Sequence, residues 1–492
     1  MEKIGKYRWT ICALVFFATT VNYLDRQVIS LLKSVLSTEL KWDDGDYANI
    51  EIAFKLFYSF GMLIAGSVVD KLGTKKGYAL ATGLWSLAAV AHAFASSAFG
   101  FMIARAGLGI TEAGNFPAAI KSTAEWFPKK ERALATGIFN SGANIGAIIA
   151  PLTVPAIAVV LGWQWAFIIT GIIGFIWLVL WQVYYTSPKD SKKLTKAEYD
   201  YIHSDKEEEE NIKNEEKVPW IKLLGFRQTW AFALGKFLTD PVWWFYLFWL
   251  PDFLQSEYKL TLIEISVPVA VVYIISTIGS IGGGYLPLAF INRNMPVFKA
   301  RKTSMFIFAL FVLPVIFSQL AGKVNMWLAV FVIGIAAAAH QAWSANIFTT
   351  VSDMFPKKAT GSVVGIGGMA GGLGGILLTW AVQKNMFVYY RSINQIETAY
   401  YIMFAICAGA YLLAWLIMHL LVPKMDKVDI FFGGGGGAGI AGTVCPIPGF
   451  GLFSLRCLLG VFGLPAIPPF SFPSFVPVSP FPPLVSFLFS FL

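Results

Sequence analysis

The chain has 492 residues, of which 56% are hydrophobic and 14% charged, and its formal net charge is +9. Soluble domains average about 25% charged residues, so this composition excludes a globular domain exposed to water on all sides. The apolar residues come in blocks of about 20, the length that a helix needs to cross ~30 Å of hydrocarbon. We therefore predict a polytopic membrane protein.

The predicted fold is all-α, with twelve transmembrane helices in two six-helix bundles and both termini in the cytoplasm. Turn residues and charges delimit the spans. In chain order they cover residues 9–32, 47–69, 77–96, 98–120, 132–161, 164–186, 230–256, 264–292, 302–320, 324–350, 359–383 and 397–422.

The distribution of basic residues predicts the orientation. With both termini inside, the cytoplasmic segments other than the central loop hold seventeen Lys and Arg residues, and the outer loops hold six. This is the positive-inside bias of membrane proteins. The net charge therefore reflects topology and does not indicate nucleic-acid binding.

The one long hydrophilic stretch divides the spans six and six. We predict an N-terminal bundle at 1–186, a cytoplasmic linker at 187–229, a C-terminal bundle at 230–423 and an anomalous tail at 424–492, rich in Gly, Pro and Phe. In the linker, Thr195 and Glu198 form a possible capping box for a short surface helix, and the acidic run 207–210 is interpreted as a solvated tether. The tail has no functional interpretation.

The two halves share an internal repeat. EWFPKKERALATGI begins at Glu125 and DMFPKKATGSVVGI begins at Asp353, an offset of 228 residues. A duplicated six-helix unit leaves such a parallel repeat, and substrate then belongs near the membrane midplane between the halves.

The segment after the second span reads GSVVDKLGTKK and resembles the signature of the major facilitator superfamily. The glycines permit close helix approach, and the resemblance implies that the acid pairs across a cytoplasmic gate. The alternative is a basic anchor at the membrane surface. The residues that match are Gly66, Asp70, Lys71, Gly73, Lys75 and Lys76.

Four charged residues interrupt apolar spans of the first half: Asp25, Arg26, Arg105 and Glu112. A charge at a helix centre costs ~2.5–3.5 kcal/mol on insertion scales, so such residues usually face a cavity and are functional. Arg105 and Glu112 are seven residues apart and share a helix face. Arg recognises carboxylates bidentately, and a poorly hydrated carboxyl group can exchange a proton. The alternative is a pair of structural ion pairs.

The stretch NYLDR, which begins at Asn22, resembles the anion:cation symporter family of this superfamily. The resemblance implies that Arg26 holds a substrate carboxylate and that Asp25 and Glu112 carry protons. It also implies that Arg105 is the partner of Glu112 and that Tyr58 contacts substrate. Asn22, one turn before Asp25, is a further candidate contact.

TDPVWWFYLFWLP (from Thr239) and AHQAWSANIFTTVSDMFPKK (from Ala339) are similar to the bacterial hexuronate transporters, inner-membrane proteins that import glucuronate and galacturonate. Sugar hydroxyls need neutral hydrogen-bonding groups, and a pyranose ring stacks on aromatic rings. The candidate contacts in the second half are Trp244, Tyr246, Gln341 and Asn346, although tryptophans in such spans also face lipid.

Other functions remain as alternatives. A proton symporter of an aldonate or aldarate would use the same first-half charges. An organophosphate exchanger would need basic clusters in both halves, and Lys236 and Arg391 are expected near span ends. A receptor would need a signalling domain. No enzyme, metal or cofactor constellation accompanies the buried carboxylates, so we expect no cofactor. The expected partners are an organic anion, protons and lipid, and a monomer is expected.

Overall fold

The fold is described from a computed structural model, which describes residues 5–204, 220–355, 357–424 and 428. These residues belong to one compact unit, Met1–Phe432. The acidic run 207–210 and, apart from Lys424 and Val428, the tail 424–492 lie outside the described residues.

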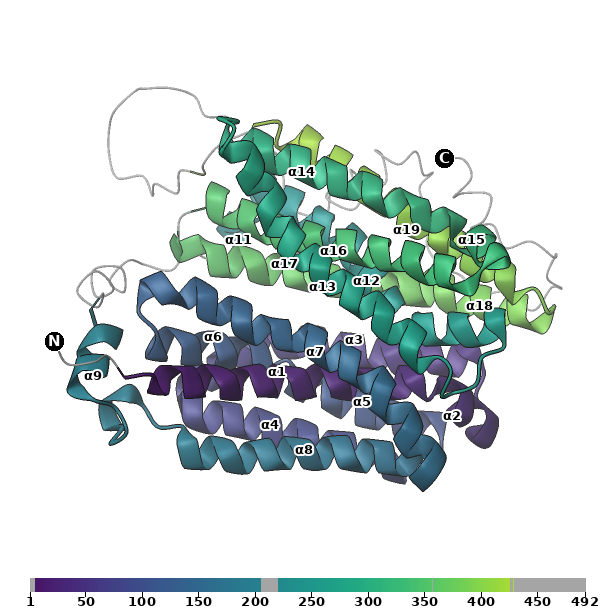
Figure 1. Ribbon diagram of the computed structural model, residues 1–492, viewed down its shortest axis with the longest axis horizontal. Coiled ribbons are helices and arrows are strands. Elements are labelled where there is room, and N and C mark those ends of the chain that lie inside the picture. Colours follow the sequence, from purple (N-terminus) through teal and green to yellow (C-terminus); the bar gives the residue numbers. More distant parts are fainter. Residues whose placement is uncertain (1–4, 205–219, 356, 425–427, 429–492) are drawn as a thin grey trace, which may run out of the picture. The chain divides into compact units, whose positions relative to one another are not determined.

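Every regular element in the described part of the chain is a helix (Figure 1). The first-half helices are α1 (Tyr7–Leu31), α2 (Lys33–Leu40), α3 (Asp44–Leu72), α4 (Thr74–Ala91), η1 (His92–Phe94), α5 (Ala98–Glu112), α6 (Asn115–Trp126), α7 (Lys129–Leu161) and α8 (Trp163–Tyr184). Between the halves lie η2 (Pro188–Asp190), α9 (Lys196–Ile202) and α11 (Trp220–Leu223). The second-half helices are α12 (Arg227–Tyr258), α13 (Ser266–Ile291), α14 (Val297–Val312), η3 (Leu313–Phe317), α15 (Ser318–Val324), α16 (Met326–Met354), α17 (Lys357–Leu378), a π-helical segment η4 (Thr379–Lys384), α18 (Asn385–Ser392) and α19 (Ile396–Leu421).

Seven of these helical stretches are long and apolar enough to cross a membrane, judged by length and composition over the described residues. They are Leu134–Leu161, Trp163–Tyr184, Ser266–Ile291, Val297–Val324, Met326–Met354, Ala359–Ser392 and Ile396–Leu421. The other five expected spans correspond to α1, α3, α4, α5 with α6, and α12. Of these, α5 has only 15 residues, and α1, α3 and α12 carry buried charges. The total of twelve spans stays a prediction.

Two predicted spans are interrupted beside a proline, although α7, α12 and α13 continue through prolines. The span expected at 98–120 is divided into α5 and α6, with the break at residues 113–114. Pro117 lacks the N–H that would bond to the carbonyl of Ala113, and its ring clashes with that carbonyl. The span expected at 302–320 changes at Pro314 from α14 to the 3₁₀ segment η3 in the same way.

The helices of each half pack mainly on one another. In Figure 1, α1 to α8 (purple to blue) lie together, and α12 to α19 (teal to yellow-green) lie beside them. The main first-half pairs are α1 with α7, α3 with α5, and α4 with α8. The main second-half pairs are α13 with α16, and α12 with α17 and α19. Between the halves, α13 packs on α7 and α17 packs on α3.

Glycines permit the close crossings within each half. A Cβ atom added at Gly146 of α7 would lie 2.3 Å from the Thr20 carbonyl oxygen of α1. One added at Gly283 of α13 would lie 2.5 Å from Cα of Ala342 on α16. Small residues let helix backbones approach in this way when lipid surrounds the helices.

The linker helix α9 binds the start of α1. The Thr195 hydroxyl caps α9 by accepting from the Glu198 N–H at 3.2 Å, as the capping-box pattern predicts. The reciprocal half of the box is not formed, because the Glu198 side chain accepts from the backbone N–H of Tyr7 and Arg8 at 3.2 and 3.1 Å. Glu198 is 1% exposed. The short helix is therefore confirmed, but it is docked rather than free at the surface.

The glycine crossings can be tested with a matched pair on α7. We expect Gly146→Ala to destabilise the protein by about 1–3 kcal/mol, the usual cost of overpacking, and to lower its thermal unfolding temperature in detergent. Gly137→Ala is the control, because a Cβ atom there meets nothing within 4 Å. Equal unfolding temperatures for the two variants would contradict the assigned crossing of α1 and α7.

Candidate functional site

The four charged residues predicted from the first half lie together. Asp25, Arg26, Arg105 and Glu112 are each at most 4% exposed. Nε of Arg26 lies 2.7 Å from Oε2 of Glu112, and Nη2 of Arg105 donates to the Arg26 carbonyl oxygen at 2.8 Å. Glu112 thus pairs directly with Arg26. Arg105 also interacts electrostatically with Glu112, although the described residues show no ion pair between them within 4 Å. The expected partnership of Arg105 with Glu112 stays a prediction.

Aromatic rings surround the guanidinium of Arg26. Its Cζ atom lies 4.7 Å from the ring centre of Tyr23, 4.6 Å from that of Tyr58 and 5.6 Å from that of Phe54. Such cation–π contacts are strongest where water is excluded. The amide of Asn22 is also buried and makes no hydrogen bond. Arg26, Tyr58 and Asn22 thus lie in one region of the site.

Asp25 is buried without a cation bound to it. It is 2% exposed, and neither carboxylate oxygen makes a hydrogen bond of normal geometry. Thr170 of α8 interacts with Asp25, but its hydroxyl donates to the Phe167 carbonyl oxygen at 3.2 Å. A buried unpaired carboxylate is costly, and a bound proton removes its charge.

The predicted second-half contacts separate into two groups. The ring of Trp244 lies 6.2 Å from that of Tyr58 and 6.1 Å from that of Phe54, so Trp244 faces the first half. Tyr246 lies two residues further along α12, about 200° around the helix. It is buried, and its hydroxyl interacts with Cys407 of α19. The structure therefore does not bring Tyr246 to Arg26.

The two amides predicted on α16 also differ. Asn346 is buried, and its Nδ2 donates to the carbonyl oxygens of Gly283 and Ala342 at 2.6 and 2.9 Å. Both of its N–H groups therefore hold helix backbones. Gln341 is half-buried. Its role as a substrate contact stays a prediction, whereas the Asn346 side chain bonds to helix backbones.

The gate motif lies at the turn between α3 and α4. Gly73 has a φ of +78°, a backbone conformation that favours glycine. The Lys75 ammonium donates to the Gln182 carbonyl oxygen at 3.0 Å. Gly66 is half-buried, and Lys71 and Lys76 are exposed. The side chain of Asp70 lies outside the described residues, so its pairing across a gate stays a prediction.

The sequence analysis missed a buried pair on α3. Nζ of Lys55 lies 3.0 Å from Oε2 of Glu51 and donates to the Thr379 hydroxyl of η4 at 2.7 Å. Both charged side chains are 1% exposed. The signal was present in EIAFK, where an acid and a base stand four residues apart inside an apolar span. Lys55 therefore joins the first half to the π-helical segment of the second.

The second half also carries a charged pair inside a helix. Nζ of Lys236 lies 2.8 Å from Oδ2 of Asp240, with the side chains 8% and 19% exposed. Helix α12 begins at Arg227 and continues to Tyr258. The expected position of Lys236 near a span end stays a prediction, although the helix extends beyond it on both sides. Lys236 is therefore more than two turns inside the helix.

Comparison with known proteins accounts for this architecture. Residues 15–379 match the Major Facilitator Superfamily. The hexuronate transporter of Escherichia coli (strain K12) is 36% identical over 382 residues, which cover 78% of this chain and 88% of that protein. The galacturonate transporter of Dickeya chrysanthemi is 37% identical over 290 residues, which cover 59% of this chain and 84% of that protein.

The chain belongs to the Major Facilitator Superfamily. It is a multi-pass membrane protein, and the named relatives are transporters rather than enzymes. Among solved structures, a bacterial homologue of the human lysosomal transporter Spinster, in an inward-facing and occupied conformation, matches with a TM-score of 0.68 and 16% identity over 87% of this chain and all of that chain. The D-xylose–proton symporter matches with a TM-score of 0.66 and 16% identity over 86% of this chain and all of that chain. These two likenesses establish the fold.

A second charged cluster joins the halves of this facilitator at the end where α2 and α18 lie, on the right in Figure 1. Nζ of Lys33 lies 2.7 Å from Asp44 and 2.9 Å from Asp252. Arg391 pairs with the same two carboxylates, at 2.9 Å for Asp252, and the Tyr400 hydroxyl donates to Asp252. Each cation therefore pairs with one carboxylate of its own half and one of the other half. We call these four residues the α2–α18 cluster.

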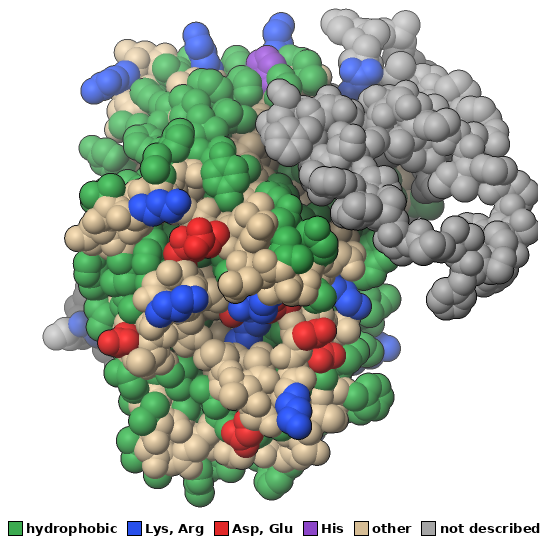
Figure 2. Space-filling model, turned by 90° about the vertical axis from the view of Figure 1, so that its right-hand side faces the viewer, with side chains coloured by type: hydrophobic (Ala, Val, Ile, Leu, Met, Phe, Trp, Pro, Cys, Tyr) green, Lys and Arg blue, Asp and Glu red, His purple; other side chains and the backbone are tan. Residues whose placement is uncertain are grey.

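A hollow opens near this cluster. Figure 2 views this end and shows acidic and basic side chains gathered across its middle. The hollow has a volume of about 480 Å³, and its lining includes Asp43, Asp46, Asn49 and Lys384. The Lys384 ammonium donates to the Asn49 side-chain oxygen at 2.9 Å, so this contact also joins the halves.

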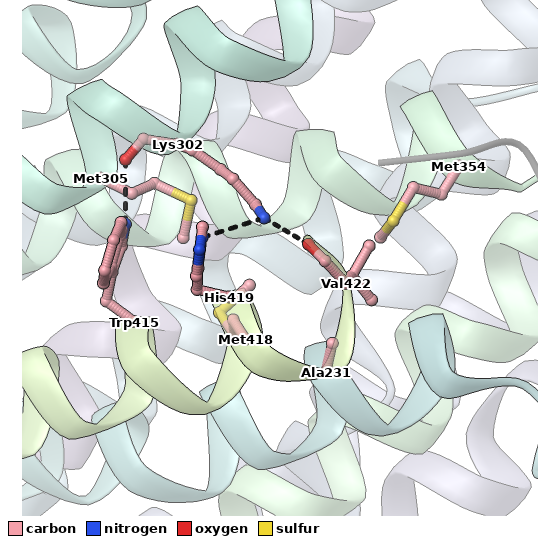
Figure 3. A pocket seen from close by; sticks show the side chains of 8 residues that line it. All are labelled: Ala231, Lys302, Met305, Met354, Trp415, Met418, His419 and Val422. Atoms are coloured by element: carbon pink, nitrogen blue, oxygen red, sulfur yellow. Dashed lines mark hydrogen bonds between the residues drawn. The ribbon is translucent and has the colours of Figure 1, made fainter. Parts of the chain in front are cut away.

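A second cavity lies within the second half, between α12, α14, α16 and α19 (Figure 3). Its volume is about 10 Å³, room for about one water molecule. Lys302 donates to the Pro423 carbonyl oxygen at 2.8 Å and to that of Val422, and it contacts His419 at 3.4 Å. The cavity is too small for a sugar, and Lys302 acts there as a tie between α14 and the end of α19.

The α2–α18 cluster predicts a specific coupling between mutations. Asp252→Asn leaves two cations facing Asp44 alone, and removing one member of a buried ion pair typically costs about 3–5 kcal/mol. Adding Arg391→Gln restores the charge balance, so we expect the double variant to be less destabilised than the sum of the single variants. Thermal unfolding in detergent measures this, with Asp353→Asn, which disrupts the pair with Arg301, as a control outside the cluster. Strictly additive losses would contradict the shared cluster.

Proposed function

We propose that this protein is a proton-coupled importer of a hexuronate such as glucuronate or galacturonate. The observation that carries the proposal is the buried Arg26–Glu112 pair at 2.7 Å, enclosed by aromatic rings and adjacent in sequence to the unpaired Asp25. The names of the two relatives, a hexuronate and a galacturonate transporter, support the same substrate class.

Arg26 is the proposed carboxylate site. Its planar guanidinium can hold a carboxylate through two parallel hydrogen bonds, but one carboxylate, that of Glu112, already occupies Nε. Substrate and Glu112 therefore compete for the same cation. Protonation of Glu112 weakens the internal pair and releases Arg26 to the substrate, which links proton uptake to substrate binding.

Asp25 is the second proposed proton carrier. Moving one negative charge into a negatively polarised cell costs ~2.3 kcal/mol per 100 mV. One proton on Glu112 cancels the charge of a hexuronate, and a second proton on Asp25 makes the membrane potential a driving force. Arg105, which holds the Arg26 backbone, is proposed to fix the helix that carries both residues.

The rest of the site is proposed to hold the sugar ring. Tyr58 and Trp244 face each other across the halves, and a pyranose ring placed on Arg26 would lie against them. Asn22 and Gln341 remain candidate hydrogen-bonding groups. For Tyr246 and Asn346 we now propose packing roles, because the first lies on the far face of α12 and the second bonds to helix backbones.

Transport is proposed to proceed by alternating access. We propose that the halves, residues 1–186 and 230–423, each contain six spans and rock against each other, with both termini in the cytoplasm. Contacts from Lys33, Asp44, Tyr47, Asn49 and Lys55 join the first half to the second. All five precede the middle of α3, so we place the closed end outside and the substrate path on the cytoplasmic side in this conformation.

Charge balance supports a monoanionic substrate over an organophosphate. In the middle of the helices each lysine has its own carboxylate, since Lys55 pairs with Glu51 and Lys236 with Asp240. A phosphate dianion would need surplus positive charge there. An aldonate or aldarate symporter stays the nearest alternative, because Arg26 would bind those acids equally well.

Uptake into proteoliposomes tests the function directly. We expect an imposed inward proton gradient to drive radiolabelled glucuronate uptake, with galacturonate as a strong competitor and gluconate and glycerol phosphate as weak ones. Arg26→Gln should reduce uptake at least 100-fold while the protein stays folded, because a bidentate charge-assisted contact is lost. Arg301→Gln, at a pair with Asp353, is the control. Gluconate as the best competitor would move the substrate to the aldonates.

Neutral replacements of the two carboxylates, Asp25 and Glu112, distinguish proton coupling from substrate binding. We expect Asp25→Asn and Glu112→Gln to retain substrate exchange across the membrane, since exchange needs no net proton movement, but to lose uphill accumulation. Counterflow and gradient-driven uptake in the same vesicles measure the two activities. A variant that still concentrates glucuronate against its gradient would show that the replaced residue is not an essential proton carrier.

A further inference from the structure

We infer that Asp240 of α12 binds hydroxyl groups of the substrate and selects polyhydroxylated acids over plain carboxylates. This inference rests on the proposed function and deepens it. Arg26 explains recognition of the acid group, which hexuronates share with every carboxylate. A group on the opposite wall must then recognise the hydroxyls.

Asp240 lies on the wall that faces Arg26. It precedes Trp244 by four residues and therefore shares its helix face, and Trp244 contacts Tyr58 of the first half. Asp240 also interacts electrostatically with Tyr23 of α1, the residue whose ring lies 4.7 Å from the Arg26 guanidinium. We therefore place the hydroxyl end of a ligand held by Arg26 on the face of α12 that carries Trp244 and Asp240.

The surroundings of Asp240 hold its carboxylate in a fixed position. The Lys236 ammonium lies 2.8 Å from Oδ2 and balances its charge, and the same ammonium lies 4.3 Å from the ring centre of Phe348. On the other side, a Cβ atom at Gly371 of α17 would lie 2.1 Å from Oδ2. The absence of a side chain at Gly371 is therefore what lets the carboxylate lie against α17.

One oxygen of this carboxylate is available. In the described part of the chain Oδ1 of Asp240 makes no hydrogen bond, and 19% of the side chain is exposed. A carboxylate accepts from neighbouring hydroxyls through several lone pairs, and such charge-assisted bonds are stronger than those to neutral acceptors. Vicinal hydroxyls of a pyranose are the ligand groups that this geometry suits.

A purely structural role explains the pair less well. Lys236 and Asp240 lie one turn apart on the same helix, so the ion pair itself joins no two helices, and pairs of this spacing stabilise a helix only weakly. By contrast, Lys55 reaches Thr379 in the other half. An ion pair within one helix that lies inside the bundle and is partly exposed is suited to a ligand.

The test compares two ligands with the purified full-length protein in detergent, using binding calorimetry. One is D-glucuronate, and the other is tetrahydropyran-2-carboxylate, which has the same ring and acid group but no hydroxyls. We expect the wild-type protein to prefer glucuronate strongly. Asp240→Asn should reduce that preference about 10- to 100-fold, because it removes a charged hydrogen-bond acceptor, while affinity for the hydroxyl-free acid changes little.

Two further variants keep the result interpretable. The double variant Asp240→Asn with Lys236→Met leaves no unpaired charge, so it serves if the single variant folds poorly, and the same loss of preference is expected. Asp353→Asn, another carboxylate with a basic partner, should keep the wild-type preference. An unchanged preference in both Asp240 variants, or an equal loss for both ligands, would overturn the inference and leave the proposed function intact. A wild-type protein that binds neither acid would overturn both.

Discussion

The ion pair between Arg26 and Glu112 is the interaction on which the rest of the site depends. Its 2.7 Å separation places a permanent cation inside a helix bundle, where an isolated charge is costly. The neighbouring residues hold that charge in place. Arg105 donates to the backbone of α1, aromatic rings cover the guanidinium, and Glu112 pairs with it. In the proposed mechanism, a proton on Glu112 weakens this pair and releases Arg26 to the substrate.

The other buried pairs divide the remaining tasks by their position. The α2–α18 cluster and Lys55 contact both halves, so in the proposed mechanism these contacts break when the halves move apart. Lys236 and Asp240 belong to one helix, so such a movement leaves their pair intact. The contacts between the halves are thus distinct from the pair that we propose to meet the substrate.

The sequence predicted the charged cluster well because each member is conspicuous alone. Asp25, Arg26, Arg105 and Glu112 interrupt long apolar runs, and no soluble surface is available to them. Their partners were not predictable, because the pairing of Glu112 with Arg26 depends on how α1 crosses α5. Glu51 and Lys55 were overlooked because they lie near the start of the expected span, where charges are common. Pro117 is the sequence signal for the break before α6, because proline disfavours a continuous helix at this position.

In the second half, the sequence could not separate the roles of neighbouring residues. Trp244 and Tyr246 belong to the same aromatic run, and composition alone gives no reason to separate them. Only the direction in which α12 faces the first half separates Trp244, which contacts Tyr58, from Tyr246, which interacts with Cys407. Similarly, an amide in an apolar helix signals a hydrogen bond but not its partner, and Asn346 uses the backbone of a neighbouring helix.

The balance of buried charges has an electrical consequence. Among the described residues, the helices bring equal numbers of basic and acidic side chains to the middle of the bundle: Arg26, Arg105, Lys55 and Lys236, against Asp25, Glu112, Glu51 and Asp240. In the proposed mechanism, with all eight ionised, the empty carrier moves no net charge when its halves reorient, and neither does a carrier loaded with one monoanion and one proton. Both reorientations would then be insensitive to membrane voltage. Any current during transport would then come from a further proton. The sign and size of that current would give the number of protons moved with each substrate molecule.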